Sequence, residues 1–160
     1  MRRFGVDTNL ILMLAVLVTT MVPSVAYADG SSRAKVTGIT GDAAFMKVGA
    51  SEWNKLEPTT MLAEGDAIKT GSDAEVRLEL VGVAKTADIT IRKETEFKFD
   101  TFRYNEAAKL DTTLLNVGVG SILVKAEKLV GDSKFEVKTP TSIVGIRGTT
   151  FEVNVPKPQV

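Results

Sequence analysis

Hydrophobic and polar residues alternate with a period of two along much of the chain. In residues 74–80, apolar side chains alternate with the charged residues Glu75, Arg77 and Glu79. The same alternation recurs in residues 89–92, 96–99, 135–138 and 151–155. Successive side chains of a strand point to opposite faces of its sheet, so this period is typical of half-buried β-strands.

Glycines separate the alternating runs, several of them beside Asp or Ser, as at Gly65, Gly71 and Gly131. Glycine permits positive φ, so this spacing predicts short strands joined by tight turns. Roughly 10 to 12 strands fit the usual interval between turn signals. Residues 105–110 depart from the pattern and could form one turn of helix or a polar loop. We therefore predict a single all-β domain of many short strands.

A weak internal repeat bears on the architecture. Residues 41–46 and 120–125 both open a strand after a glycine, and each is followed further on by Gly-Asp, at positions 65–66 and 131–132. Two similar halves favour a twisted, solenoid-like sheet or sandwich with layered turns. A jelly roll is the alternative.

The start of the chain has the layout of a secretory signal. Arg2 and Arg3 precede an apolar run over residues 9–18, and Ala26 and Ala28 occupy the −3 and −1 positions of a small-residue cleavage site. We expect cleavage after Ala28, which would leave a periplasmic or secreted protein with no stable membrane span.

This prediction divides the chain into four parts. They are a signal peptide (1–28), a short linker (29–35), an all-β domain (36–155) and a C-terminal tail (156–160). The alternative is that residues 11–25 are retained as a membrane anchor, since their apolar length approaches that of a membrane span.

The amino-acid composition excludes several kinds of binding and catalytic site. Lys and Arg together number 20, as do Asp and Glu, so no basic field is available and no nucleic-acid partner is expected. The chain has no Cys and no His, which removes the usual zinc ligands and the Ser-His and Cys-His nucleophile arrangements. Carboxylate pairs such as Glu94 and Glu96 fall on the outward face of a strand, where acid catalysis lacks the burial it needs. We expect no cofactor, no metal and no catalytic residue.

Two stretches are similar to the FecR family. The first runs from Trp53 through residues 65–72 into the strand 74–80. The second, residues 135–140 and 143–153, resembles the closing pattern Phe-x-Val-x-Thr-Pro followed by Val-x-Gly-Val-Arg-Gly-Thr-x-Phe-x-Val. The positions that carry the resemblance are Trp53, Gly65, Asp66, Thr70, Phe135, Val137, Thr139, Pro140, Gly145, Arg147, Gly148, Thr149, Phe151 and Val153. Residues 81–84 depart from the family's Asp-Gly-Ser, which predicts a longer hairpin there.

The resemblance implies a periplasmic sensor domain, here as a stand-alone exported copy. We expect a binding module that recognises an envelope protein or a cell-wall glycan through its loops or a sheet edge, where backbone groups can accept a partner strand. One alternative is a structural protein that forms homo-oligomers by pairing the same edge with itself. Another is a glycan-cleaving enzyme that uses carboxylates alone.

Most signature positions have a structural interpretation. Thr139 and Pro140 would end a strand, and Gly148 beside Thr149 would make a turn that sends Phe151 and Val153 into the core. Arg147 is expected to form an internal ion pair, and an acidic partner is the alternative.

Two positions in the first stretch leave a choice between structure and binding. Trp53 is expected to cover one end of the core, and the alternative is a flat face for a sugar or peptide. Gly65 and Asp66 are expected to form a turn with an Asx hydrogen bond, and the alternative is a metal site.

Overall fold

The computed structural model describes residues 33–82, 85–105 and 108–158. Its strands are β1 (Arg33–Thr40), β2 (Ala43–Met46), β3 (Asn54–Lys55), β4 (Met61–Leu62), β5 (Ala67–Thr70), β6 (Glu75–Val81), β7 (Lys85–Ile91), β8 (Glu96–Asn105), β9 (Leu110–Ala126), β10 (Lys134–Lys138), β11 (Ile143–Ile146) and β12 (Thr150–Val155). None of the described residues form a helix, so no helix that could span a membrane occurs among them. The predicted all-β class is confirmed.

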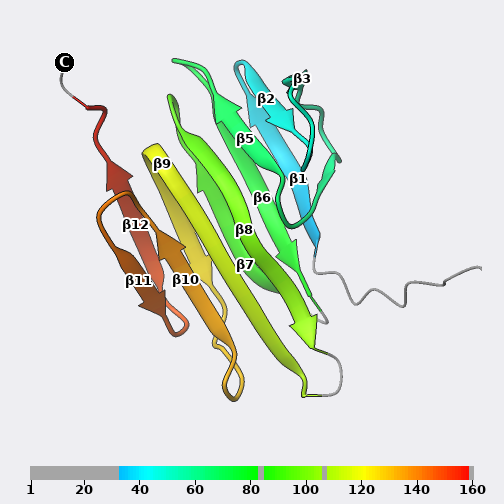
Figure 1. Ribbon diagram of the computed structural model, residues 1–160, viewed down its shortest axis with the longest axis vertical. Helices are drawn as coiled ribbons and strands as arrows, with labels where there is room; N and C mark the ends of the chain where they lie inside the picture. Colours follow the sequence, from blue (N-terminus) through cyan, green and yellow to red (C-terminus); the bar gives the residue numbers. More distant parts are fainter. Residues whose placement is uncertain (1–32, 83–84, 106–107, 159–160) are drawn as a thin grey trace, which may run out of the picture.

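The strands form a bent sheet with two arms (Figure 1). The first arm has the order β4-β1-β6-β7-β9-β12, and the second has the order β3-β2-β5-β8-β9-β10-β11. Strand β9 belongs to both, because residues 110–119 pair with β8 whereas residues 120–126 pair with β7 and β12. All pairings are antiparallel except that of β10 with β9.

The chain crosses between the arms at corners that stack on one another. They lie between β1 and β2, between β5 and β6, between β7 and β8, and inside β9. Gly41 and Gly120 have positive φ at two of them. A Cβ on Gly120 would lie 2.3 Å from Thr95 Oγ1, so only glycine fits that corner. These layered corners agree with the expected twisted, solenoid-like sheet.

The core lies between the inner faces of the two arms. Its largest fully buried side chains include Phe97, Phe99 and Phe135. The register of β8 against β9 shifts between Phe99 and Thr101, and this bulge turns Phe102 inward, where its ring stacks on Phe99 with 5.5 Å between centroids. An unbroken period of two would have placed Thr101 there instead.

The ends and one loop differ in detail from the expectations. Strand β1 begins at Arg33, inside the segment 29–35 for which we predict a linker. The predicted signal peptide, with Ala26 and Ala28, lies outside the described residues. After β8, the described residues take the polar-loop alternative, in which Ala108 N donates to Asn105 Oδ1 (3.0 Å).

Candidate functional site

The β10–β11 hairpin carries the first half of the closing signature. Phe135 and Val137 are buried in the core, as their alternation predicts. Thr139 N donates to Ser142 O (2.8 Å), and Ser142 N donates to Thr139 Oγ1 (3.1 Å). Pro140 occupies the turn between them, so Thr139 and Pro140 end the strand as expected.

Strand β11 is an open edge of the second arm, because among the described residues it pairs only with β10. Hydrogen-bonded and non-hydrogen-bonded residue pairs alternate along an antiparallel ladder. Thr139 and Ser142 form a hydrogen-bonded pair, so the next pair, which contains Ile143, is non-hydrogen-bonded, and so is the pair that contains Gly145. The backbone groups of Ile143 and Gly145 therefore point away from β10.

This edge is apolar and accessible. The side chains of Ile143 and Val144 are 61% and 45% exposed. No atom lies within 4 Å of a Cβ built on Gly145, and a shallow hollow of about 330 Å³ is lined by Gly145, Glu136 and Arg147, among others. Open strand edges with apolar side chains readily accept another strand.

Arg147 corrects one expectation. It is exposed and lines this hollow, and no carboxylate of the described residues lies within ion-pair distance of its guanidinium. The predicted internal ion pair is therefore wrong for this part of the chain. Ile146 is buried, but the side chain of Arg147 lies at the surface, where it meets no buried acid.

The other edges of the sheet are better protected. Strands β3 and β4 have two residues each, too short to offer a long ladder. On β12, the carboxylate of Glu152 lies 3.3 Å from Arg92 Nε and accepts a hydrogen bond from Ser121 Oγ (3.0 Å), and Pro156 follows the strand. Charged pairs and proline are common ways to blunt an edge.

The turn after β11 confirms the role expected of Gly148. This residue has a φ of 70°, and a Cβ there would lie 2.8 Å from Lys128 Cα. Thr149 O accepts a hydrogen bond from Ala126 N (3.1 Å), which starts the pairing of β12 with β9. Phe151 and Val153 pack against the core but are only partly buried, because they lie on an edge strand.

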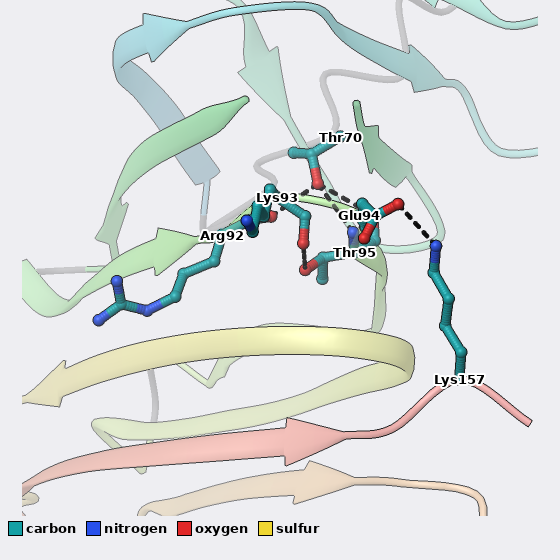
Figure 2. A network of polar contacts seen from close by, with 6 residues as sticks. All are labelled: Thr70, Arg92, Lys93, Glu94, Thr95 and Lys157. Carbon is teal, nitrogen blue, oxygen red and sulfur yellow. Dashed lines mark hydrogen bonds and ion pairs between the residues drawn. The ribbon is translucent and has the colours of Figure 1, made fainter. Parts of the chain in front are cut away.

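Thr70 lies at a corner rather than at a binding surface (Figure 2). Its hydroxyl donates to Arg92 O (2.7 Å) and accepts from Thr95 N (2.9 Å). At the same corner Lys157 Nζ lies 2.7 Å from Glu94 Oε1, and this hydrogen bond holds the pKa of the Glu94 carboxyl below its usual value. The network joins the C-terminal segment to the corner between β7 and β8.

Asp66 is buried and forms a structural cap. Its carboxylate accepts hydrogen bonds from Lys47 Nζ (2.6 Å), Val48 N (3.0 Å) and Ala63 N (3.0 Å). Asp66 N donates to Ala63 O (3.1 Å), and Gly65 has a φ of 88°. The expected turn is present. Its side-chain bond runs back to Ala63, however, whereas an Asx turn would run forward.

The expectation that Trp53 covers one end of the core is also wrong. Its side chain is 43% exposed, and the buried residue of this segment is Leu56. Trp53 therefore does not cover an end of the core. It precedes the two-residue strand β3 at the margin of the second arm, where none of the described strands pairs beyond β3.

Comparison with models of protein families matches residues 66–160 to the family described as FecR protein. The chain belongs to the FecR family. FecR domains are typically periplasmic, and the family is one of signalling and regulatory domains. Comparisons with curated proteins and with solved structures give no match.

The FecR match includes Asp66, Thr70 and the whole closing signature. Of these positions, the structure brings only Gly145 and Arg147 to the open edge, together with Ile143 and Val144, to which sequence reasoning gave no binding role. One signal could have pointed to them. Ile143 and Val144 are adjacent apolar residues in a run without alternation, and an arginine follows three residues after Val144.

Proposed function

We propose that this FecR domain is an exported, non-catalytic sensing module that binds another envelope protein. The observation that carries the proposal is the open edge of β11, with outward backbone groups at Ile143 and Gly145 and exposed apolar side chains. A polypeptide strand can pair with such an edge through its backbone, which a glycan cannot do.

The position of the family signature supports this proposal. The signature threonine at a corner has a structural role, because the Thr70 hydroxyl accepts a hydrogen bond from Thr95 N. Gly120 has a structural role too, because a Cβ there would clash with Thr95. Gly145 and Arg147 have no comparable role, since the space above Gly145 is open and Arg147 lies beside it. Residues without a packing role on an accessible surface are the ones that we assign to recognition.

Site-specific photo-crosslinking in cells tests this function. A photoreactive amino acid replaces Ile143 in the full-length chain, and the control replaces Val48, which is exposed but lies near the opposite end of the second arm. We expect adducts with one envelope protein from position 143 and none from position 48. Equal adducts at both positions would contradict the proposal. Adducts of two copies of this chain would favour self-assembly, and co-sedimentation with purified cell wall alone would favour a glycan partner.

A further inference from the structure

The two faces of β11 differ in chemistry. On the inner face, Val144 lies opposite Val137 and Ile146 lies opposite Phe135, so both extend rows of core residues. Ile146 is buried, whereas Val144 remains 45% exposed. The inner face thus ends in an apolar side chain that one further apolar neighbour would cover.

The outer face is cationic. Ile143 lies opposite Lys138 and Gly145 lies opposite Glu136, and by the same alternation Lys134 and Arg147 follow on this face. Three cations therefore accompany one carboxylate. Within the described part of the chain, none of these four charged groups takes part in an ion pair.

We propose that β11 binds an extended segment of the partner in which acidic and apolar residues alternate. The segment would pair with the N–H and C=O groups of Ile143 and Gly145. Its apolar side chains would cover Val144 on the inner face, and its carboxylates would lie near Lys134, Lys138 and Arg147 on the outer face. This inference rests on the proposed function and names the class of partner.

A second copy of this chain fits the edge less well. Antiparallel pairing of β11 with itself would bring two cationic outer faces together and would provide no carboxylate for Arg147. In the chain's own β6, apolar residues alternate with Glu75, Arg77 and Glu79, but that strand is already paired with β1 on one side and β7 on the other. Charge therefore favours a different, acidic partner.

The test uses two labelled ten-residue peptides, one alternating valine with glutamate and one alternating valine with lysine. Binding to the full-length chain is measured by fluorescence anisotropy. We expect the glutamate peptide to bind at least ten-fold more tightly than the lysine peptide. The charge reversals Lys134→Glu and Lys138→Glu together should invert this preference while leaving the backbone unchanged.

A separate variant tests whether the peptide pairs with the backbone of β11. Gly145→Pro removes an N–H that points to the open edge and not to β10, so the hairpin should persist while peptide binding falls at least ten-fold. Gly145→Ala is the matched control, because it keeps the N–H and its Cβ meets no neighbouring atom. Gly145→Pro should therefore bind the glutamate peptide at least ten-fold more weakly than Gly145→Ala does. Circular dichroism and thermal melting verify that both variants fold.

Three results would overturn the inference. They are equal binding of the two peptides, unchanged binding by a folded Gly145→Pro variant, and concentration-dependent dimers that Gly145→Pro abolishes, which would place a second copy at the edge. Crosslinks from position 143 to an envelope protein without any peptide preference would leave the proposed function standing and remove only this inference. Peptide preference without such crosslinks would leave the preference of the edge for acidic segments standing and contradict an envelope protein as the partner.

Discussion

Thr70 and Thr95 exchange hydrogen bonds across two stacked corners of the bent sheet. Thr70 N donates to Thr95 O (3.0 Å), and Thr95 N donates to the hydroxyl of Thr70 (2.9 Å). Both residues are buried. The pair ties the corner between β5 and β6 to the corner between β7 and β8, so the stacking of these two corners depends on a threonine hydroxyl.

Replacing Thr70 with valine should destabilise the domain by about 1–3 kcal/mol, because Thr95 N and Arg92 O would lose their buried partner. Urea denaturation followed by circular dichroism measures this change. Thr70→Ser keeps the hydroxyl and is the control, with an expected loss of less than about 1 kcal/mol. Equal losses in both variants would show that the hydroxyl contributes little.

Asp66→Asn should also destabilise the fold by about 1–3 kcal/mol, because the amide replaces one acceptor oxygen by a donor that faces Lys47 Nζ or a backbone N–H. The matched control is Asp73→Asn, an exposed carboxylate, for which a change within about 0.5 kcal/mol is expected. The free energies of unfolding of the two variants, measured by denaturant titration, test this difference. A neutral effect at Asp66 would argue against the buried cap.

Phe99→Ala and Phe151→Ala should differ in cost. Phe99 is fully buried, and truncation of a buried phenylalanine typically costs about 3–5 kcal/mol. Phe151 lies half-buried on the edge strand β12, so about 1–2 kcal/mol is expected from the smaller area that it removes from water. Thermal and urea unfolding of both variants provide the comparison. A larger loss at Phe151 would contradict the described packing of β12.

The pair formed by Glu64 and Arg103 predicts a dependence on pH. The Arg103 hydrogen bond is the main reason that the pKa of the Glu64 carboxyl lies below its usual value of 4.5. A lowered folded-state pKa means that the contribution is present above the unfolded-state value and is lost as pH falls through the folded-state value.

Glu64→Gln should therefore be less stable than wild type at pH 7, by less than about 1 kcal/mol because the pair is partly exposed. The difference should shrink as the pH falls from 7 to 3. Melting temperatures of both proteins across this range test it. A difference that grows on acidification would contradict the assigned direction.

Local periodicity accounts for much of the fold. The alternating run 74–80 lies in β6 apart from Ala74, which precedes it, and the runs in β7, β8, β10 and β12 also follow the pattern. The two-residue strands β3 and β4 are too short to show any period. The inward turn of Phe102 depends on a bulge, and the exposure of Trp53 depends on its place at the sheet margin. Both depend on pairing between strands that are distant in sequence, and the two-residue alternation along one strand does not predict that pairing.

The candidate site was harder to predict for the same reason. The local sequence around Gly145 and Arg147 predicts a strand followed by a turn, and the structure has both. Whether Ile143 is covered depends on the presence of a further strand beside β11, which only the strand order reveals. An interior ion pair for Arg147 was a reasonable expectation from its flanking glycines, but the strand runs along the surface.

Strand β9 has a consequence for how the domain assembles. Its 17 residues complete the ladders of both arms, so neither arm has its full set of neighbours until the whole strand is in place. A nascent chain that stops before residue 110 lacks the element that holds the two layers together. We therefore expect a single cooperative unfolding transition with no stable half-domain, and slow folding limited by the closure of distant segments.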